Sequence, residues 1–203
     1  MKTVLYIHGM GGGEDRRIPN LLRERMKGVD VLCRTCDFNP TVASNQLSVW
    51  FQDWKPDLVI GESLGSLQAL KLRGVPHLFV SPALNSATLL HLVAPLTLIP
   101  GMRGFLGRSF KPREGDRQHL DFSFKTLRDF SSVKVRKLCP TDDYVYAFFG
   151  TKDHYRRSGI VSVRTWRNLF GEGTWTEYDG THYMEEEFID SLLIPKIQEI
   201  LGD

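Results

Sequence analysis

Short strand-like apolar runs alternate with helix-like segments along most of the chain, and this alternation restricts the possible folds more than any other feature. The strand-like runs are residues 4–7, 29–33, 58–60, 75–80, 144–149 and 175–178. Apolar residues recur at helical spacing in residues 18–26, 47–54, 64–73, 163–170 and 188–200, where Pro195 should kink the last helix. Strands that alternate with helices predict an α/β fold, with a mostly parallel sheet covered by helices on both faces.

One long segment interrupts the alternation. No clear strand occurs between the run that ends near residue 80 and the run that starts near residue 144. Its first part is apolar, and residues 101–137 are basic and punctuated by glycine. So long an excursion inside a compact domain is usually functional. We therefore predict a single domain over residues 1–203 with a cap or lid insertion at residues 85–140.

Composition excludes several classes of protein. Lys and Arg number 26 against 24 Asp and Glu, so the chain lacks the strong basic excess of a general nucleic-acid binder. The longest apolar stretch, residues 89–99, is too short to span a bilayer, and residues 4–7 are too short for a signal peptide. Three cysteines, an odd number, suit a reducing compartment. We expect a cytoplasmic protein with no membrane span and no nucleic-acid partner; the sequence does not specify its oligomeric state.

The sequence Gly-Glu-Ser-Leu-Gly at residues 61–65 is the sharpest chemical signal. It follows an apolar strand and opens a helix, as a nucleophile elbow does. Ser63 would lie on a strained turn, with a glycine two positions to each side so that side chains do not collide. The alternative is a glycine-rich turn with an inert serine. We favour Ser63 as a nucleophile.

A nucleophilic serine needs a base, and His182 is the best candidate. It lies in a loop directly after the strand 175–178 and before the last helix, where it would project over the carboxyl ends of the strands. His77 lies within a strand pattern and His91 on an apolar segment, so both are expected to be packing residues.

The base needs an orienting carboxylate, for which we favour Asp153. It follows the strand 144–149 and so shares an edge of the sheet with the serine and the histidine. Asp179 competes because it is close to His182 in sequence, whereas Asp142 and Asp143 precede their strand and lie at the wrong edge. The alternative role for Asp153 is that of a turn or helix-capping residue.

Two backbone N–H groups are needed to bind the oxyanion. Leu64, just after the serine, is one source, and Met10 in the glycine-rich loop after the first strand is the other. His8 could be a metal ligand or a base, but its position before Gly9 favours a role in shaping that loop. The glycines at 11–13 lack the pattern of a phosphate-binding loop.

Cys33 and Cys36 have the spacing of a redox dithiol. No second pair is present for zinc, and the two lie on a strand and its exit rather than at the start of a helix. We interpret them as small core or edge residues, and we expect neither a metal nor a cofactor.

Together these motifs resemble those of the α/β-hydrolases, and more narrowly those of the YqiA-like small bacterial esterases. The resemblance covers essentially the whole chain and rests on His8-Gly9, the motif at 61–65, and the sequences at 80–85, 150–153 and 181–183. It implies that Ser63 is the nucleophile, Asp153 the acid and His182 the base.

The sequence therefore predicts a serine hydrolase that cleaves a small-molecule carboxylic ester or thioester through an acyl-enzyme. Apolar residues of the insertion that could line an acyl pocket are Leu89, Leu92, Val93 and Leu96. The basic part of the insertion could favour an anionic leaving group or be a solvated loop. The alternatives are a peptidase or amidase, a non-catalytic binding protein with the same fold, and a basic surface for nucleic acid or anionic lipid.

Overall fold

Six parallel strands form the central sheet of the protein. The computed structural model describes residues 1–14, 17–110, 117–135, 138 and 143–202. The strands are β1 (Lys2–Ile7), β2 (Val29–Leu32), β3 (Leu58–Glu62), β4 (His77–Val80), β5 (Val145–Gly150) and β6 (Trp175–Tyr178). Their order is β2-β1-β3-β4-β5-β6, and every neighbouring pair is parallel. The predicted parallel sheet is confirmed.

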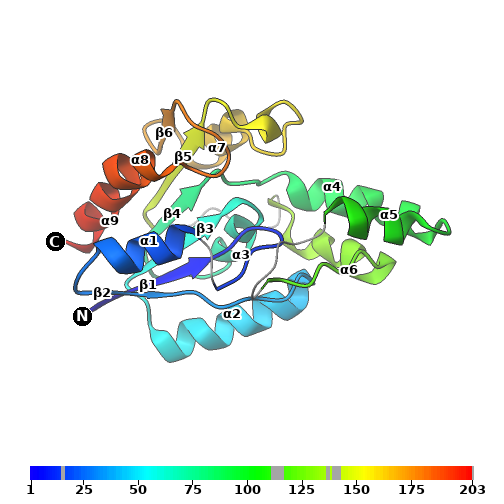
Figure 1. Ribbon diagram of the computed structural model, residues 1–203, viewed down its shortest axis with the longest axis horizontal. Coiled ribbons are helices and arrows are strands. Elements are labelled where there is room, and N and C mark those ends of the chain that lie inside the picture. The colour runs from blue at the N-terminus through cyan, green and yellow to red at the C-terminus, as the bar shows by residue number, and fades with distance from the viewer. Residues whose placement is uncertain (15–16, 111–116, 136–137, 139–142, 203) are drawn as a thin grey trace.

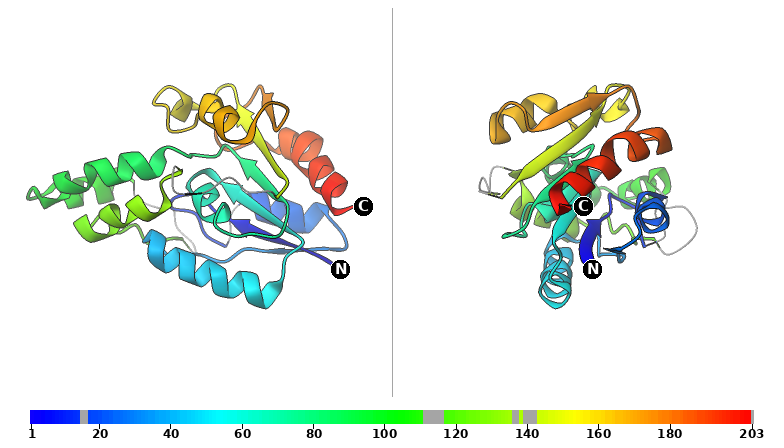
Figure 2. Two further views of the ribbon diagram at one scale, coloured as in Figure 1. Left: turned by 180° about the vertical axis from the view of Figure 1, so that it is seen from behind. Right: turned by 90° about the vertical axis from the view of Figure 1, so that its left-hand side faces the viewer.

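Helices cover both faces of this sheet (Figure 1). One face carries α1 (Arg17–Arg25), α8 (Glu186–Phe188) and α9 (Ile194–Leu201), and the other carries α2 (Pro40–Trp54), α3 (Ser66–Ala69) and α7 (Val163–Phe170). Figure 2 shows the two layers from behind and from the end. Side chains alternate along each strand, so Val4 and Tyr6 join the α1–α9 core while Leu5 and Ile7 join the α2–α7 core.

Three helices differ from the sequence prediction at their ends. Helix α2 begins at Pro40 instead of near residue 47, because the Asn39 side chain accepts hydrogen bonds from the N–H groups of Thr41 and Val42 and caps it. Helix α3 ends at Ala69 rather than near residue 73. A π-helical turn, Ile189–Leu193, separates α8 from α9 just before Pro195, which is where a proline without an N–H was expected to bend the last helix.

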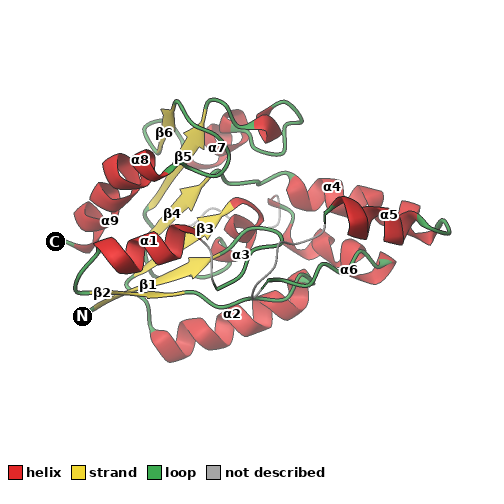
Figure 3. Ribbon diagram, in the orientation of Figure 1, coloured by secondary structure: helices red, strands yellow, loops and turns green. Residues whose placement is uncertain are grey.

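The segment between β4 and β5 contains helices joined by irregular stretches, of which residues 117–123 are the longest described one. It contains α4 (Ser86–Val93), a 3-10 helix (Ala94–Leu98), α5 (Met102–Ser109), α6 (Phe124–Asp129) and a second 3-10 helix (Phe130–Val133). Figure 3 shows these helices beyond the carboxyl ends of the strands. His91 Nδ1 lies 3.0 Å from the Arg128 carbonyl oxygen and ties α4 to α6. Residues 111–116, 136–137 and 139–140 of the predicted cap lie outside the described residues, and its role as a lid stays a prediction.

Within the described ranges, none of the helices is both long and apolar enough to cross a membrane.

His77 is a buried histidine at the start of β4. Its side chain is 1% exposed and stacks on Phe79, with the ring centroids 6.0 Å apart. This burial lowers the pKa of His77 from 6.5 to about 4, because the charged imidazolium would lose its hydration. His77 is therefore a neutral core residue at neutral pH, as the strand pattern predicted.

The depressed pKa of His77 should make the fold sensitive to mild acid. Between pH 6.5 and about 4 the unfolded chain binds a proton at this residue that the folded chain does not. The free energy of unfolding therefore decreases as the pH is lowered through this range. The expected loss is about 3 kcal/mol across that range. Urea unfolding of wild type and His77→Leu at several pH values measures it.

His77→Leu should show a flatter dependence on pH than wild type does. His91→Ala is the matched control, because it removes an imidazole from α4 rather than from the sheet, and it should keep the wild-type slope. Equal slopes for wild type and His77→Leu would contradict the prediction.

Candidate active site

The turn from β3 into α3 holds Ser63 in a strained conformation. Ser63 has a φ of +50°, in the left-handed region that side chains other than glycine rarely adopt. A Cβ on Gly61 would lie 2.9 Å from Ala69 Cβ, and one on Gly65 would overlap the carbonyl oxygens of Ile7 and His8. Both glycines of the motif are thus required by close packing of the turn against α3 and β1.

Ser63, His182 and Asp153 form a hydrogen-bonded chain. Ser63 Oγ lies 2.9 Å from His182 Nε2, and His182 Nδ1 lies 2.7 Å from Asp153 Oδ2. His182 and Asp153 are each 3% exposed. The three residues follow β3, β6 and β5 respectively, so the parallel sheet brings them to one edge. In the neutral histidine, Nδ1–H donates to the carboxylate and Nε2 accepts from the serine hydroxyl.

Asp153 also caps the short 3-10 helix that follows it. Its Oδ1 accepts the Tyr155 N–H at 2.8 Å while Oδ2 contacts His182, so the capping role and the contact with histidine coexist. The competing Asp179 points elsewhere: its side chain is 77% exposed and lies 2.9 Å from Lys152 Nζ. Asp143 accepts the Gly74 N–H at the opposite end of the strands, and Asp142 lies outside the described residues.

The loops that carry Asp153 and His182 are joined directly by a backbone hydrogen bond. Lys152 N–H donates to the Gly180 carbonyl oxygen at 2.9 Å. A Cβ on Gly150 would overlap the carbonyl oxygens of Gly180 and Thr181, so a larger residue would force the loops apart. The spacing between acid and histidine therefore depends on backbone contacts.

Sequence reasoning missed two residues that position His182. The Glu185 carboxylate accepts the Thr181 N–H at 3.0 and 3.1 Å, which fixes the loop just before the histidine. The Tyr155 ring stands edge-on to the imidazole, with the centroids 4.7 Å apart. Both lie within a few residues of a predicted catalytic residue, which is the only signal that could have marked them.

The glycine-rich loop after β1 passes directly beside the serine. A Cβ on Gly9 would lie 3.0 Å from Ser63 Cβ, so glycine at this position lets the loop approach. His8 is 2% exposed; its Nε2 accepts the Cys36 N–H at 3.0 Å and its Nδ1 lies 2.8 Å from the Gly9 carbonyl oxygen. Both ring nitrogens therefore contact backbone, which supports the loop-shaping role. The predicted donor Met10 follows Gly9 in this loop.

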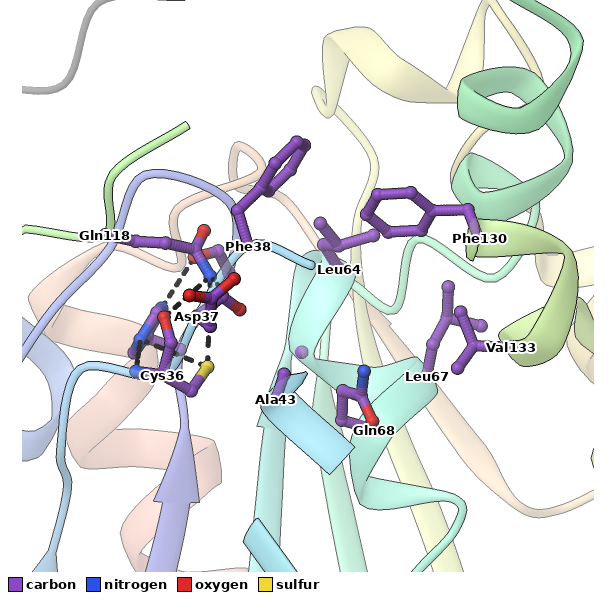
Figure 4. A pocket seen from close by; sticks show the side chains of 13 residues that line it. Cys36, Asp37, Phe38, Ala43, Leu64, Leu67, Gln68, Gln118, Phe130 and Val133 are labelled. Carbon is purple, nitrogen blue, oxygen red and sulfur yellow. Dashed lines mark hydrogen bonds between the residues drawn. The ribbon is translucent and has the colours of Figure 1, made fainter. Parts of the chain in front are cut away.

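Gln118 ties this loop to its surroundings and was not anticipated. Its Oε1 accepts the Gly11 N–H at 3.1 Å, and its own N–H donates to the Gly12 carbonyl oxygen at 2.7 Å. Its Nε2 donates to the carbonyl oxygens of Cys36 and Asp37, each at 3.0 Å (Figure 4). A single glutamine in an irregular polar segment gives no sequence signal for such contacts.

A mainly apolar pocket lies beside the turn that carries Ser63. Among its lining residues are Phe38, Leu64, Leu67, Phe130 and Val133 (Figure 4).

The four predicted acyl-contact residues are not among those that line this pocket. Leu89, Leu92 and Leu96 are 46%, 65% and 48% exposed, and Val93 packs against the core. Their role as substrate contacts stays a prediction.

The two described cysteines are buried and unpaired. Burial raises the pKa of the Cys33 and Cys36 thiols to about 12, so they are protonated at neutral pH. Across the described ranges, no group of three or more His, Cys, Asp or Glu side chains could hold a metal ion.

Similar folds occur among solved structures, although no family model and no curated protein matches the sequence. Tomato methylketone synthase I has a TM-score of 0.60 at 10% identity, with 98% of each chain covered. A carboxylesterase study of the thaumarchaeon Nitrososphaera gargenis supplies a structure with a TM-score of 0.56 at 14% identity, covering 100% of this chain and 92% of that one.

The fluorophosphonate-binding serine hydrolase F of Staphylococcus aureus has a TM-score of 0.54 at 14% identity, covering 100% of this chain and 84% of that one. At these identities the likeness concerns the fold alone. The parallel sheet and its helical layers match these neighbours, and the chain has the α/β-hydrolase fold. The narrower resemblance to the YqiA-like esterases stays a prediction.

The packing of Gly65 gives a direct test of the turn. Gly65→Ala places a methyl group against the rigid carbonyls of Ile7 and His8 and should lower the free energy of unfolding by about 1–3 kcal/mol. Gly104→Ala is the matched control, because no atom lies within 4 Å of a Cβ there and alanine favours helix α5. Urea unfolding measures both, and a Gly65→Ala variant as stable as wild type would contradict the prediction.

Proposed function

We propose that the protein is a serine hydrolase that cleaves carboxylic esters or thioesters. The observation that carries this proposal is the hydrogen-bonded chain from Ser63 through His182 to Asp153. In the proposed mechanism, His182 Nε2 removes the Ser63 proton as Oγ attacks the acyl carbon. Asp153 holds the histidine in the required tautomer and stabilises the imidazolium that forms.

The backbone N–H groups of Leu64 and Met10 would bind the oxyanion. Leu64 lies in the first turn of the 3-10 helix Ser63–Gly65, where N–H groups lack partners within the helix. Met10 follows Gly9, whose backbone passes close to the Ser63 side chain. Both donors would therefore lie beside Ser63, where the oxyanion of the tetrahedral intermediate forms.

The complete cycle needs only these groups and water. Collapse of the first tetrahedral intermediate breaks the bond from the acyl carbon to the leaving oxygen or sulfur, which takes the proton held by His182. Water then attacks the Ser63 acyl ester, gives a proton to His182, and releases the carboxylic acid while Ser63 Oγ recovers that proton. No step calls for a metal or a cofactor.

The structural neighbours and the surroundings of the site add support for an acyl substrate. The neighbours with this fold include carboxylesterases and a serine hydrolase, which makes the same chemistry a reasonable proposal for this chain. The apolar side chains of Leu64, Phe38 and Phe130, which line the pocket beside the turn that carries Ser63, suit an acyl chain.

Replacement of Ser63 tests the nucleophile. Wild type should hydrolyse p-nitrophenyl esters, and Ser63→Ala should lower kcat by about 10³-fold or more, because the covalent step is lost. Ser48→Ala, an exposed serine on α2, is the matched control and should keep wild-type rates. The acyl-length profile measures the pocket, and p-nitroanilides in parallel separate an esterase from an amidase.

A fluorophosphonate reagent should label wild type and Ser48→Ala but not Ser63→Ala. A folded wild type that neither turns over any ester nor takes the label would contradict the proposal and favour a non-catalytic binding protein.

The two rival carboxylates can be distinguished by isosteric changes. Asp153→Asn should lower kcat by about 10³–10⁴-fold, because an amide beside Nδ1 favours the wrong tautomer of His182. Asp179→Asn, which changes only exposed contacts with Lys152 and Thr151, should stay within about twofold of wild type. Steady-state kinetics on one p-nitrophenyl ester measures both, and the reverse ranking would assign the acid to Asp179.

A further inference from the structure

Most of the exposed large apolar side chains occur in one stretch of the chain, from α4 through the following 3-10 helix to the residue after α5. Of the twelve large hydrophobic residues that are exposed in the described chain, seven fall between residues 89 and 110. We call this set the α4–α5 surface; it consists of Leu89, Leu92, Leu96, Leu98, Ile99, Phe105 and Phe110. So high a density of exposed apolar residues in one stretch differs from the singly scattered apolar residues of an ordinary protein surface.

Helices α4 and α5 expose apolar side chains that helices normally bury against another part of the protein or a partner. In α4, Leu90 and Val93 pack against the core while Leu89 and Leu92 are exposed, so the helix is apolar on two sides. A surface helix normally has one apolar stripe that faces the core and polar residues opposite, so a second apolar side indicates a further contact. Helix α5 has no buried residue and contains Gly104 and Gly107, which makes so short a helix marginal in water.

The charges around the surface favour an anionic partner. No Asp or Glu occurs in the sequence between Glu62 and Glu114, whereas Arg103 and Arg108 lie on α5. Arg108 is exposed; Arg103 is 60% exposed and lies 3.6 Å from the Asp121 carboxylate. A two-fold contact between copies would bring these like charges together, whereas lipid phosphates would neutralise them.

The surface also lies on the side of the molecule that carries the serine. The Ala83 N–H, shortly before α4, donates to the Ser63 carbonyl oxygen at 3.1 Å. Figure 1 shows α4 and α5 extending beyond the same ends of the strands. A flat partner on these helices would therefore meet the protein on the side of the carboxyl ends of the sheet.

We propose that the α4–α5 surface docks on a lipid bilayer that contains anionic headgroups. The leucines and phenylalanines of the surface enter the boundary between headgroups and acyl chains, and Arg103 and Arg108 face the phosphates. Docking does not depend on the hydrolase activity, so a result that contradicts one of the two proposals does not contradict the other.

Vesicle flotation tests the docking. Wild type should float with vesicles of phosphatidylcholine and phosphatidylglycerol, and at least about tenfold less with phosphatidylcholine alone or at high salt. Leu98→Ser/Phe105→Ser should weaken binding to the anionic vesicles by about tenfold or more. Val42→Ser/Val49→Ser is the matched control, because it removes two exposed apolar residues from α2 and should bind as wild type does.

Circular dichroism and thermal unfolding show that each variant is folded, whether or not the protein turns over esters. An absence of flotation, equal binding to both vesicle types, or an equal loss in the α2 control would overturn the proposal. Sedimentation analysis tests whether the surface instead forms a contact between two copies of the chain. A concentration-dependent dimer that Leu98→Ser/Phe105→Ser abolishes, without vesicle binding, would assign the surface to a second copy of the chain.

Discussion

The geometry of the candidate site depends on a contact between backbone and backbone. The turn after β3 presses on the end of β1 so closely that Gly65 has no room for a Cβ beside the Ile7 and His8 carbonyls. The same closeness brings Gly9 against Ser63 and holds the serine at a positive φ. A strained residue persists only where its surroundings fix it. Here the surroundings are two adjacent parallel strands rather than a flexible loop.

A second contact of the same kind sets the distance between the histidine and the carboxylate. Gly150 at the end of β5 meets the carbonyls of Gly180 and Thr181 after β6, and hydrogen bonds between the two loops lock them in register. Because all six strands are parallel, every strand delivers its following loop to one edge. The parallel sheet thus brings Ser63, Asp153 and His182 together although they are far apart in the sequence.

The features that local sequence could predict are those that local geometry determines. The motif at 61–65 predicts the turn that contains it, and the ends of the predicted strands place Asp153 and His182 at one edge. The start of α2 was also readable, because Asn39 before Pro40 is a capping signal that the apolar spacing alone overlooked.

Other features depend on contacts that no local pattern records. Sequence order left Asp179 as a rival of Asp153; in the structure Asp179 lies beside Lys152, at the surface. The bonds of Gln118 join residues about a hundred positions apart, and only the folded chain brings them together. The exposure of Leu92 and Leu98 likewise follows from how the segment between β4 and β5 packs and cannot be predicted from their hydrophobicity.

The position of Gln118 couples two parts of the molecule whose stabilities would otherwise be separate. Proteins open locally in cooperative units, so the segment between β4 and β5 can open while the sheet beneath it stays folded. If the stretch that begins at Gln118 detaches, the Gly11 N–H and the Gly12 carbonyl lose their partners and the loop beside Ser63 loses its shape. The loop beside the serine is then only as stable as the segment between β4 and β5, however stable the sheet beneath it.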